Sequence, residues 1–175
     1  DEEIEFTRTC MAVRPPGGRV SVCPGPINIV YTELGLLEAS SELAREHGTI
    51  WHTHCCAPRQ DPEIFQTEYG ARPVEWLLER SMLGQHTTLA HATWLSDSEV
   101  SALGNTGTGV AHCPGSNMYM PYGVMRLRDL RASGAVVGLG TDGSACGHRQ
   151  DMFEQMKLTT LLHRIHSLDP VASAP

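Results

Sequence analysis

The stretch TELGLLEASSELAREHGTIWHTHC, residues 32–55, contains the pattern of a helix followed directly by that of a strand. Thr32 is a residue type that caps helix N-termini, and leucines repeat at helical spacing over Leu34–Leu43. Gly48 stands where helices commonly end in a left-handed residue, and Thr49–Cys55 then predicts a buried strand. This order of elements is typical of a unit of a parallel α/β sheet.

The same alternation continues along the chain. Predicted strands lie at Arg19–Cys23, Thr49–Cys55, Thr87–Ala92, Gly107–Cys113 and Ala135–Thr141. Predicted helices begin after Thr32, at Asp61, at Arg72 and at Ser96, where Glu99 completes a capping box, and two more cover Val124–Ala132 and Asp151–His166. The sequence therefore predicts an α/β fold with a parallel sheet. A complete (β/α)8 barrel needs about 250 residues, so the 175 residues of this chain would form only part of one.

The composition excludes several classes of function. The net charge is −7 with 13 Lys and Arg residues, which disfavours a nucleic-acid partner. The chain has no apolar run long enough for a membrane span and no basic, apolar leader, so we expect a cytoplasmic protein with no membrane partner. The six cysteines form no C-x-x-C pair, and most lie in apolar runs, which favours core thiols over disulfides or metal ligands. This balance suits a protein that acts on small molecules.

Four polar residues stand at the carboxyl ends of different predicted strands: His54, His91, His112 and Asp142. Each has an ordinary structural explanation when taken alone. His54 could be satisfied by a neighbouring carbonyl group, His91 could be a core histidine, and His112 could mark only a strand exit before Pro114. Thr-Asp-Gly-Ser is also favourable turn chemistry for Asp142. Taken together, they would meet at one edge of a parallel sheet, where the active sites of barrels are built. The coincidence favours a functional site.

The motifs around these residues resemble one family. They are LAHATWL (residues 89–95), HCPGSNM (112–118), GLGTDGSA (138–145) and the pair Asp151-Met152. In this order, over Arg19–His166, they resemble the amidohydrolase superfamily, and within it the deaminase and chlorohydrolase branch of guanine, 8-oxoguanine, S-adenosylhomocysteine and triazine hydrolases. The resemblance implies a partial (β/α)8 TIM-type barrel that covers roughly strands 4 to 8 and their helices. It would form one unit over residues 1–168, followed by a tail over residues 169–175.

The resemblance also implies roles for individual residues. His54, on the fifth strand of the barrel, would bind a divalent metal, Zn or alternatively Fe. Asp142, on the eighth, would be a metal ligand and proton acceptor, and His91, on the sixth, would face the bound water or the substrate. His112 and Asn117 would lie near the substrate. The implied activity is hydrolysis of a carbon–nitrogen bond in a small heterocycle, with metal-activated water as nucleophile.

Two departures from the family pattern support an alternative. The His-x-His pair of the family's first strand has no counterpart, since His52-Thr53-His54 corresponds to the fifth strand. The fifth-strand motif His-x-x-Glu ends here in Ala57, and the nearby acids Asp61 and Glu63 fall in the following loop and helix start. The alternative is therefore an incomplete or non-catalytic amidohydrolase fold that binds a ligand or partner without turnover. Unpaired edges of an incomplete barrel would also favour a homo-oligomer.

Overall fold

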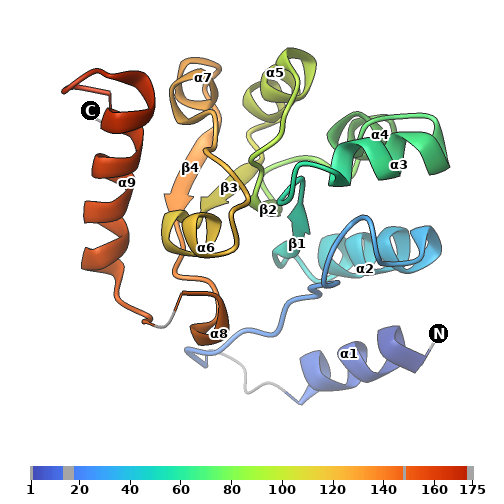
Figure 1. Ribbon diagram of the computed structural model, residues 1–175. Coiled ribbons are helices and arrows are strands. Elements are labelled where there is room, and N and C mark those ends of the chain that lie inside the picture. Colours follow the sequence, from blue (N-terminus) through green and yellow to red (C-terminus); the bar gives the residue numbers. More distant parts are fainter. Residues whose placement is uncertain (1, 14–17, 148, 173–175) are drawn as a thin grey trace.

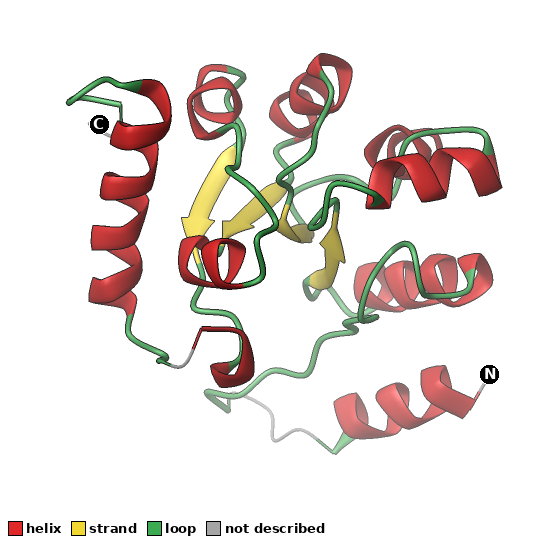
Figure 2. Ribbon diagram, in the orientation of Figure 1, coloured by secondary structure: helices red, strands yellow, loops and turns green. Residues whose placement is uncertain are grey.

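The structure is a computed structural model that describes residues 2–13, 18–147 and 149–172. The described chain alternates helices with short strands (Figures 1 and 2). In chain order, the elements are α1 (Glu2–Ala12), α2 (Leu34–Glu46), β1 (Trp51–Cys55), α3 (Asp61–Tyr69), α4 (Pro73–Glu79), β2 (Thr87–His91), α5 (Asp97–Thr106), β3 (Gly109–His112), α6 (Pro114–Tyr119), α7 (Leu127–Ala132), β4 (Val136–Leu139), α8 (Ser144–Gly147) and α9 (Met152–Ser167).

The four described strands form one parallel sheet in the order β1-β2-β3-β4. Each strand therefore pairs with the next strand in the chain, as neighbouring strands of a (β/α)8 barrel do. Longer helices lie outside the sheet, whereas the short helices α6 and α8 follow the carboxyl ends of β3 and β4 (Figure 1). The predicted α/β fold is confirmed, and the arrangement is that of part of a barrel.

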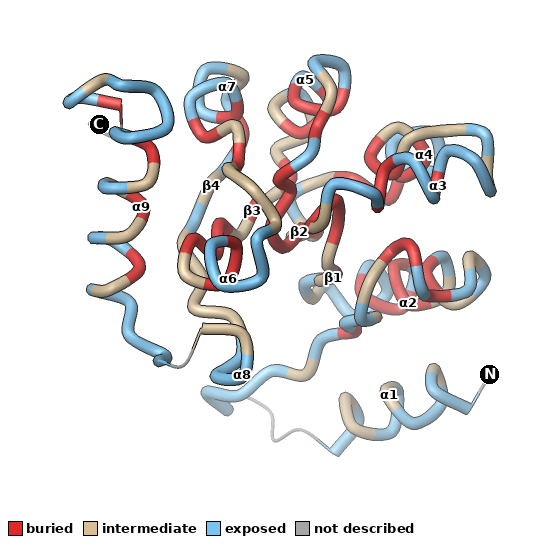
Figure 3. Tube along the Cα trace, in the orientation of Figure 1, coloured by how far each residue is buried: buried red, intermediate tan, exposed pale blue. Residues whose placement is uncertain are grey.

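The core lies between the sheet and its outer helices, where the buried parts of the chain face one another (Figure 3). Side chains of alternate strand residues, such as Trp51, Leu89 and Val110, are buried there against Leu37 and Leu103 of the helices. Alternation is required because successive strand residues point to opposite faces of a sheet. We call the side packed against the helices the outer face and the opposite side the inner face.

Several local predictions are confirmed. The strands lie within the predicted segments but are shorter at their ends. The capping box at the start of α5 forms, since Ser96 Oγ accepts from the Glu99 N–H and the Glu99 carboxylate accepts from the Ser96 N–H. Gly48 has a φ of 58°, the left-handed conformation expected after a helix. Asp151 caps α9 by accepting from the N–H groups of Phe153 and Glu154.

The predicted strand at Arg19–Cys23 is wrong. This segment has no regular structure, and Val20 is 73% exposed, so its short apolar pattern has no core to pack against. The chain instead passes β1 a few residues later, where Asn28 forms an isolated bridge with His54. Pro24 and Pro26 explain the irregular path, because proline lacks the N–H group that a continuous ladder requires.

The helix starts also differ in detail from the predictions. Helix α2 begins at Leu34, with Glu33 rather than Thr32 at the N-cap position. Asp61 lies inside the first turn of α3 instead of capping it. The short helices α6 and α8 and the exposed helix α1 were not predicted.

The described part of the predicted tail is attached to the fold. Arg128 forms an ion pair with Asp169 and donates a hydrogen bond to the Ala172 carbonyl, and Ala172 is buried. Residues 173–175, which belong to the same predicted tail, lie outside the described residues.

Within the described part of the chain, no helix has both the length and the apolar character needed to cross a membrane. All six cysteines are free thiols.

Candidate functional site at the strand ends

The parallel sheet brings the ends of its strands to one edge, and three of the predicted site residues meet there. His54 is the penultimate residue of β1, His91 ends β2, and Asp142 follows β4. The rings of His54 and His91 stack with centroids 5.2 Å apart, and His91 Nε2 lies 3.7 Å from Asp142 Oδ2. We call His54, His91 and Asp142 the strand-end cluster.

His54 lies on the inner face of the sheet. In β1, Trp51, Thr53 and Cys55 are buried against the helices, whereas His52 and His54 are only half-buried. The Nδ1 atom of His54 is hydrogen-bonded to the carbonyl oxygen of Ile27. Because a carbonyl oxygen can only accept, Nδ1 carries a proton, and in the neutral ring the free lone pair would lie on Nε2. This arrangement, with one ring nitrogen fixed by a carbonyl, is common among metal-binding histidines.

His91 reaches the cluster through an unusual backbone. It pairs with Cys55, which is on the outer face, so a regular strand would place His91 there too. His91 and Ala92 instead have φ values of 68° and 45°, and the ring lies against His54. His91 is 1% exposed, and this burial lowers its pKa more than its hydrogen bond with Asn117 raises it. The ring is therefore neutral at neutral pH.

Asp142 is held as a carboxylate. Its Oδ2 accepts a 2.5 Å hydrogen bond from Ser116 Oγ, and its Oδ1 accepts from the Gly143 N–H at 2.6 Å. Burial by itself would raise the pKa of Asp142, but these two donors hold it below the ordinary value. The cluster thus places a carboxylate beside two imidazole rings.

The donor set of the cluster fits part of a zinc site. The free Nε2 of His54 and the carboxylate of Asp142 are the nitrogen and oxygen ligands that Zn²⁺ prefers. Catalytic zinc sites have three protein ligands, however. Among the residues that the structure describes, no group of three His, Cys, Asp or Glu side chains is arranged to hold a metal. His52 shares the inner face, but its ring centroid lies 6.2 Å from that of His54.

Asn117 and His112, the two remaining predicted site residues, are placed differently. Asn117 is fully buried beside the cluster, where its Oδ1 lies 2.8 Å from His91 Nδ1 and its Nδ2 donates to Thr93 Oγ1. His112 lies on the outer face, where its Nε2 is 3.2 Å from Nε2 of His163 in α9. Burial, reinforced by the charge of His163, lowers the pKa of His112 to about 3. The structure therefore does not bring His112 to the strand-end cluster.

Ser116 and Tyr122 belong to the surroundings of the cluster, and sequence reasoning assigned neither. Ser116 stands within the HCPGSNM motif, but the motif alone gives no sign that its hydroxyl meets Asp142. The ring of Tyr122 contacts that of His91 edge-on, with centroids 5.5 Å apart. No sequence signal pointed to this tyrosine.

The two acids near Ala57 both lie in the first turn of α3 but differ in exposure. Asp61 is fully buried without a hydrogen bond to its carboxyl oxygens, whereas Glu63 is exposed. Burial raises the pKa of Asp61, although the Ala57 N–H, the Asn28 amide and His54 are close enough to oppose that rise. Ala57 itself is buried, and its methyl group offers no proton.

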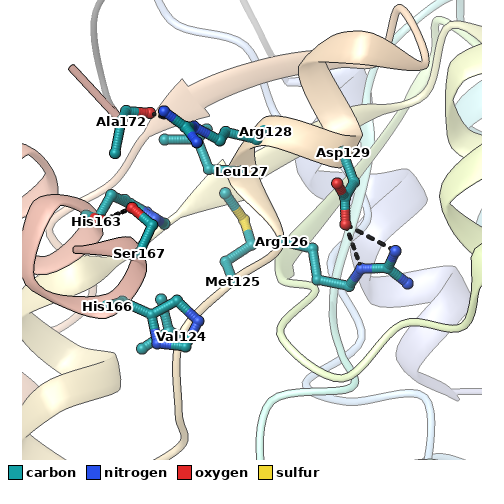
Figure 4. A pocket seen from close by; sticks show the side chains of 10 residues that line it. All are labelled: Val124, Met125, Arg126, Leu127, Arg128, Asp129, His163, His166, Ser167 and Ala172. Atoms are coloured by element: carbon teal, nitrogen blue, oxygen red, sulfur yellow. Dashed lines mark hydrogen bonds and ion pairs between the residues drawn. The ribbon is translucent and has the colours of Figure 1, made fainter. Parts of the chain in front are cut away.

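A separate pocket of about 160 Å³ lies between α7 and α9 (Figure 4). Met125 and Leu127 line one side of it, and His163 and His166 project from α9 on the other. None of the three strand-end residues lines this pocket. The strand-end cluster and this pocket therefore lie in different parts of the molecule.

Known proteins resemble this chain over most of its length. A model of the "Amidohydrolase family" matches residues 17–174. A 5-methylthioadenosine/S-adenosylhomocysteine deaminase from Thermococcus kodakarensis is 39% identical over 152 residues, which are 87% of this chain and 36% of that protein. An 8-oxoguanine deaminase from Pseudomonas aeruginosa is 33% identical over 87% of this chain and 34% of its own length. The chain thus spans about a third of these relatives.

Solved structures support the fold. An adenosine deaminase from Xanthomonas campestris with bound zinc superposes with a TM-score of 0.92 at 23% identity, over 98% of this chain and 39% of that one. The atrazine chlorohydrolase TrzN from Arthrobacter aurescens, complexed with zinc, superposes with a TM-score of 0.89 at 24% identity, over 96% of this chain and 38% of that one.

Proposed function

The chain belongs to the amidohydrolase family, and we propose that it supplies part of a metal-dependent hydrolase acting on a carbon–nitrogen bond of a small heterocycle. The substrates named for its relatives, methylthioadenosine and 8-oxoguanine, are nitrogen heterocycles of the purine type. The proposed reaction is removal of an amino group from such a ring by water.

The arrangement of acceptors in the strand-end cluster carries this proposal. Because His91 Nδ1 faces the Asn117 carbonyl oxygen, it carries the ring proton, and Nε2 is bare. This bare nitrogen faces the carboxylate of Asp142 across 3.7 Å, and neither atom can donate to the other. Two such acceptors favour a hydrogen-bond donor or a cation between them. A water molecule bound to a metal would be such a donor.

Each residue then has a defined task in the proposal. His54 Nε2 and the Asp142 carboxylate would hold the metal, preferably Zn²⁺ and alternatively Fe²⁺, together with at least one ligand beyond these two. The chemistry that such an ion supplies when bound is to lower the pKa of a water molecule to about 7. Asp142 accepts the proton of the attacking water, and His91 orients that water or the substrate through Nε2.

A specific observation favours the second candidate, a fold that binds a ligand without turnover. Ala57 stands where the family motif has a glutamate, and its buried methyl group cannot deliver a proton to a ring nitrogen.

Self-association of the protein also stays a prediction. The apolar side chains of Phe153, Ile165 and Leu168 on or just after α9 are largely exposed, which is consistent with a further contact surface.

Metal analysis of the intact protein, combined with ammonia release from a panel of purines and triazines, tests both candidates. We expect bound metal and turnover in the wild type, and loss of both in His54→Ala and Asp142→Ala. His47→Gln, a change of an exposed histidine far from the strand ends, is the matched control and should retain both. Metal content unchanged in the two alanine variants would contradict the ligand assignment. Bound metal without turnover of any ring would support the non-catalytic candidate.

A further inference from the structure

Two consecutive residues of α6 each bind a different member of the strand-end cluster. Ser116 Oγ donates to Asp142 Oδ2 at 2.5 Å, and Asn117 Oδ1 lies 2.8 Å from His91 Nδ1. Ser116 and Asn117 are 0% and 1% exposed, so neither side chain has water as an alternative partner. A single turn of chain therefore connects the two reacting groups of the proposed function.

The contact with Asn117 fixes where His91 carries its proton. The amide oxygen of Asn117 can only accept, so Nδ1 of His91 must be the protonated nitrogen. The amide itself is oriented by its other end, where Nδ2 donates to Thr93 Oγ1 at 3.3 Å. In a neutral ring with its proton on Nδ1, the nitrogen that faces Asp142 is an acceptor. Reversal of this tautomer would present an N–H to Asp142 instead.

The backbone at the cluster needs such support. His91 and Asp142 both have left-handed φ values, 68° and 61°, without being glycine. Non-glycine residues keep this conformation only where their surroundings hold them in it. The bonds from Ser116 and Asn117 connect the side chains of both residues to one element.

We propose that Ser116 and Asn117 are positioning residues: Asn117 sets the tautomer of His91, and Ser116 sets the orientation of the Asp142 carboxylate. The proposal rests on the proposed function only in treating His91 and Asp142 as the reacting groups. Asn117 then acts through His91, and its amide is occupied by His91 and Thr93 rather than offered to the substrate. Its variants should lower kcat and leave KM nearly unchanged.

Nitrogen-15 NMR of the intact protein labelled at histidine tests the tautomer directly, without requiring turnover. His91→Gln assigns the resonances. In the wild type, we expect a protonated Nδ1 and a bare Nε2. In Asn117→Leu, which has similar volume but no acceptor, we expect the Nε2-protonated form to become populated. Asn117→Asp retains an acceptor and should restore the wild-type tautomer. Tyr122→Phe is the matched control, because it keeps the edge-on ring contact with His91.

Kinetics of the same variants test the consequence. Partners that orient groups of a metal site typically contribute about 10- to 100-fold to activity. We expect a fall of that size in kcat for Asn117→Leu and Ser116→Ala, with KM within a few-fold, and recovery in Ser116→Thr. A tautomer unchanged in Asn117→Leu overturns the proposal even if the protein is an active hydrolase. A rise in KM with kcat intact would also overturn it, because that pattern marks direct substrate contact. If no ring is hydrolysed, the proposed function fails while the tautomer result still decides this inference.

Discussion

Two pairs of histidines each include at least one histidine from the carboxyl end of a strand, and they have the same spacing but different surroundings. The rings of His54 and His91 and those of His112 and His163 both have centroids 5.2 Å apart. The first pair is stacked on the inner face beside Asp142. The second is tilted by 59° and buried between β3 and α9 on the outer face. A histidine at a strand end therefore does not by itself identify a site.

The pairs also differ in how their nitrogen atoms are satisfied. In the outer pair, one Nε2 donates to the other across 3.2 Å, whereas the buried Nδ1 of His112 has no hydrogen-bond partner among the described residues. In the strand-end cluster, the bare Nε2 of His91 faces a carboxylate, and neither can donate. Two rings joined by their own hydrogen bond need no further group between them, whereas two facing acceptors that cannot bond to each other are suited to hold a donor or a cation. This difference leads to the following predictions.

The largest expected effect comes from giving the strand-end cluster the proton donor that it lacks. Ala57→Glu in the intact protein should raise deaminase activity towards purines or triazines, because the glutamate would protonate the ring nitrogen during attack. General acid catalysis typically contributes about 10²- to 10⁴-fold. The measurement is kcat/KM for ammonia release.

Ala57→Gln is the matched control, since it has the shape of glutamate but no acidic proton, and it should not raise activity. Equal effects of Glu and Gln, or rapid turnover by the wild type that Glu fails to improve, would show that residue 57 is not the vacant acid position. His52 would then become the better candidate ligand, because the fifth-strand assignment depends on the same alignment.

A smaller effect is expected for the outer pair, His112 and His163, whose contribution to the free energy of unfolding should depend on pH. The pKa of His112 is lowered to about 3, whereas an unfolded histidine titrates near 6.5. Folding therefore excludes a proton from His112, and the stability that this histidine contributes is present above pH 6.5 and lost as the pH falls towards 3. The slope for one such group is about 1.4 kcal/mol per pH unit. His163, whose pKa burial also lowers, adds to the same trend.

His112→Leu should flatten this slope by about 1.4 kcal/mol per pH unit, because leucine takes up no proton in either state. Denaturant unfolding between pH 5 and pH 8 measures the change. Met125→Leu, a nearly volume-conserving change beside His163, is the control and should keep the wild-type slope. Parallel stability curves for wild type and His112→Leu would show that His112 is not held neutral by its burial.

The comparison of the two pairs also shows how far the sequence could lead. Local signals predicted the elements well, because the capping box of Ser96 and Glu99 and the glycine at position 48 depend only on neighbouring residues. The strand at Arg19–Cys23 failed because its short apolar pattern finds no partner surface, and Pro24 and Pro26 interrupt the ladder that follows. Local patterns cannot report whether a surface exists to cover them.

The face on which a strand-end residue lies was harder to predict. A shift of one residue moves a side chain to the other face of a sheet, and sequence-based strand ends are uncertain by more than that. His112 follows the regular alternation to the outer face. His91 should have done so as well, but its left-handed backbone brings it to His54. The residue types in this segment do not predict that conformation, since neither His91 nor Ala92 is glycine.

The smallest expected effect tests that backbone turn. Ala92 has a φ of 45°, a conformation that costs a non-glycine residue roughly 1–2 kcal/mol. Ala92→Gly relieves this cost but loses a buried methyl group, worth about 0.8 kcal/mol, and adds freedom to the unfolded chain, worth about 0.5–1 kcal/mol. The terms nearly cancel, so the free energy of unfolding should change little. Ala90→Gly, at a buried position inside regular β2, suffers the two losses without the relief and should be about 1–2 kcal/mol worse. Denaturant unfolding of both variants measures the difference. Equal destabilisation would mean that the turn at residues 91 and 92 stores no strain, and the separation of the two histidine pairs would then need another cause.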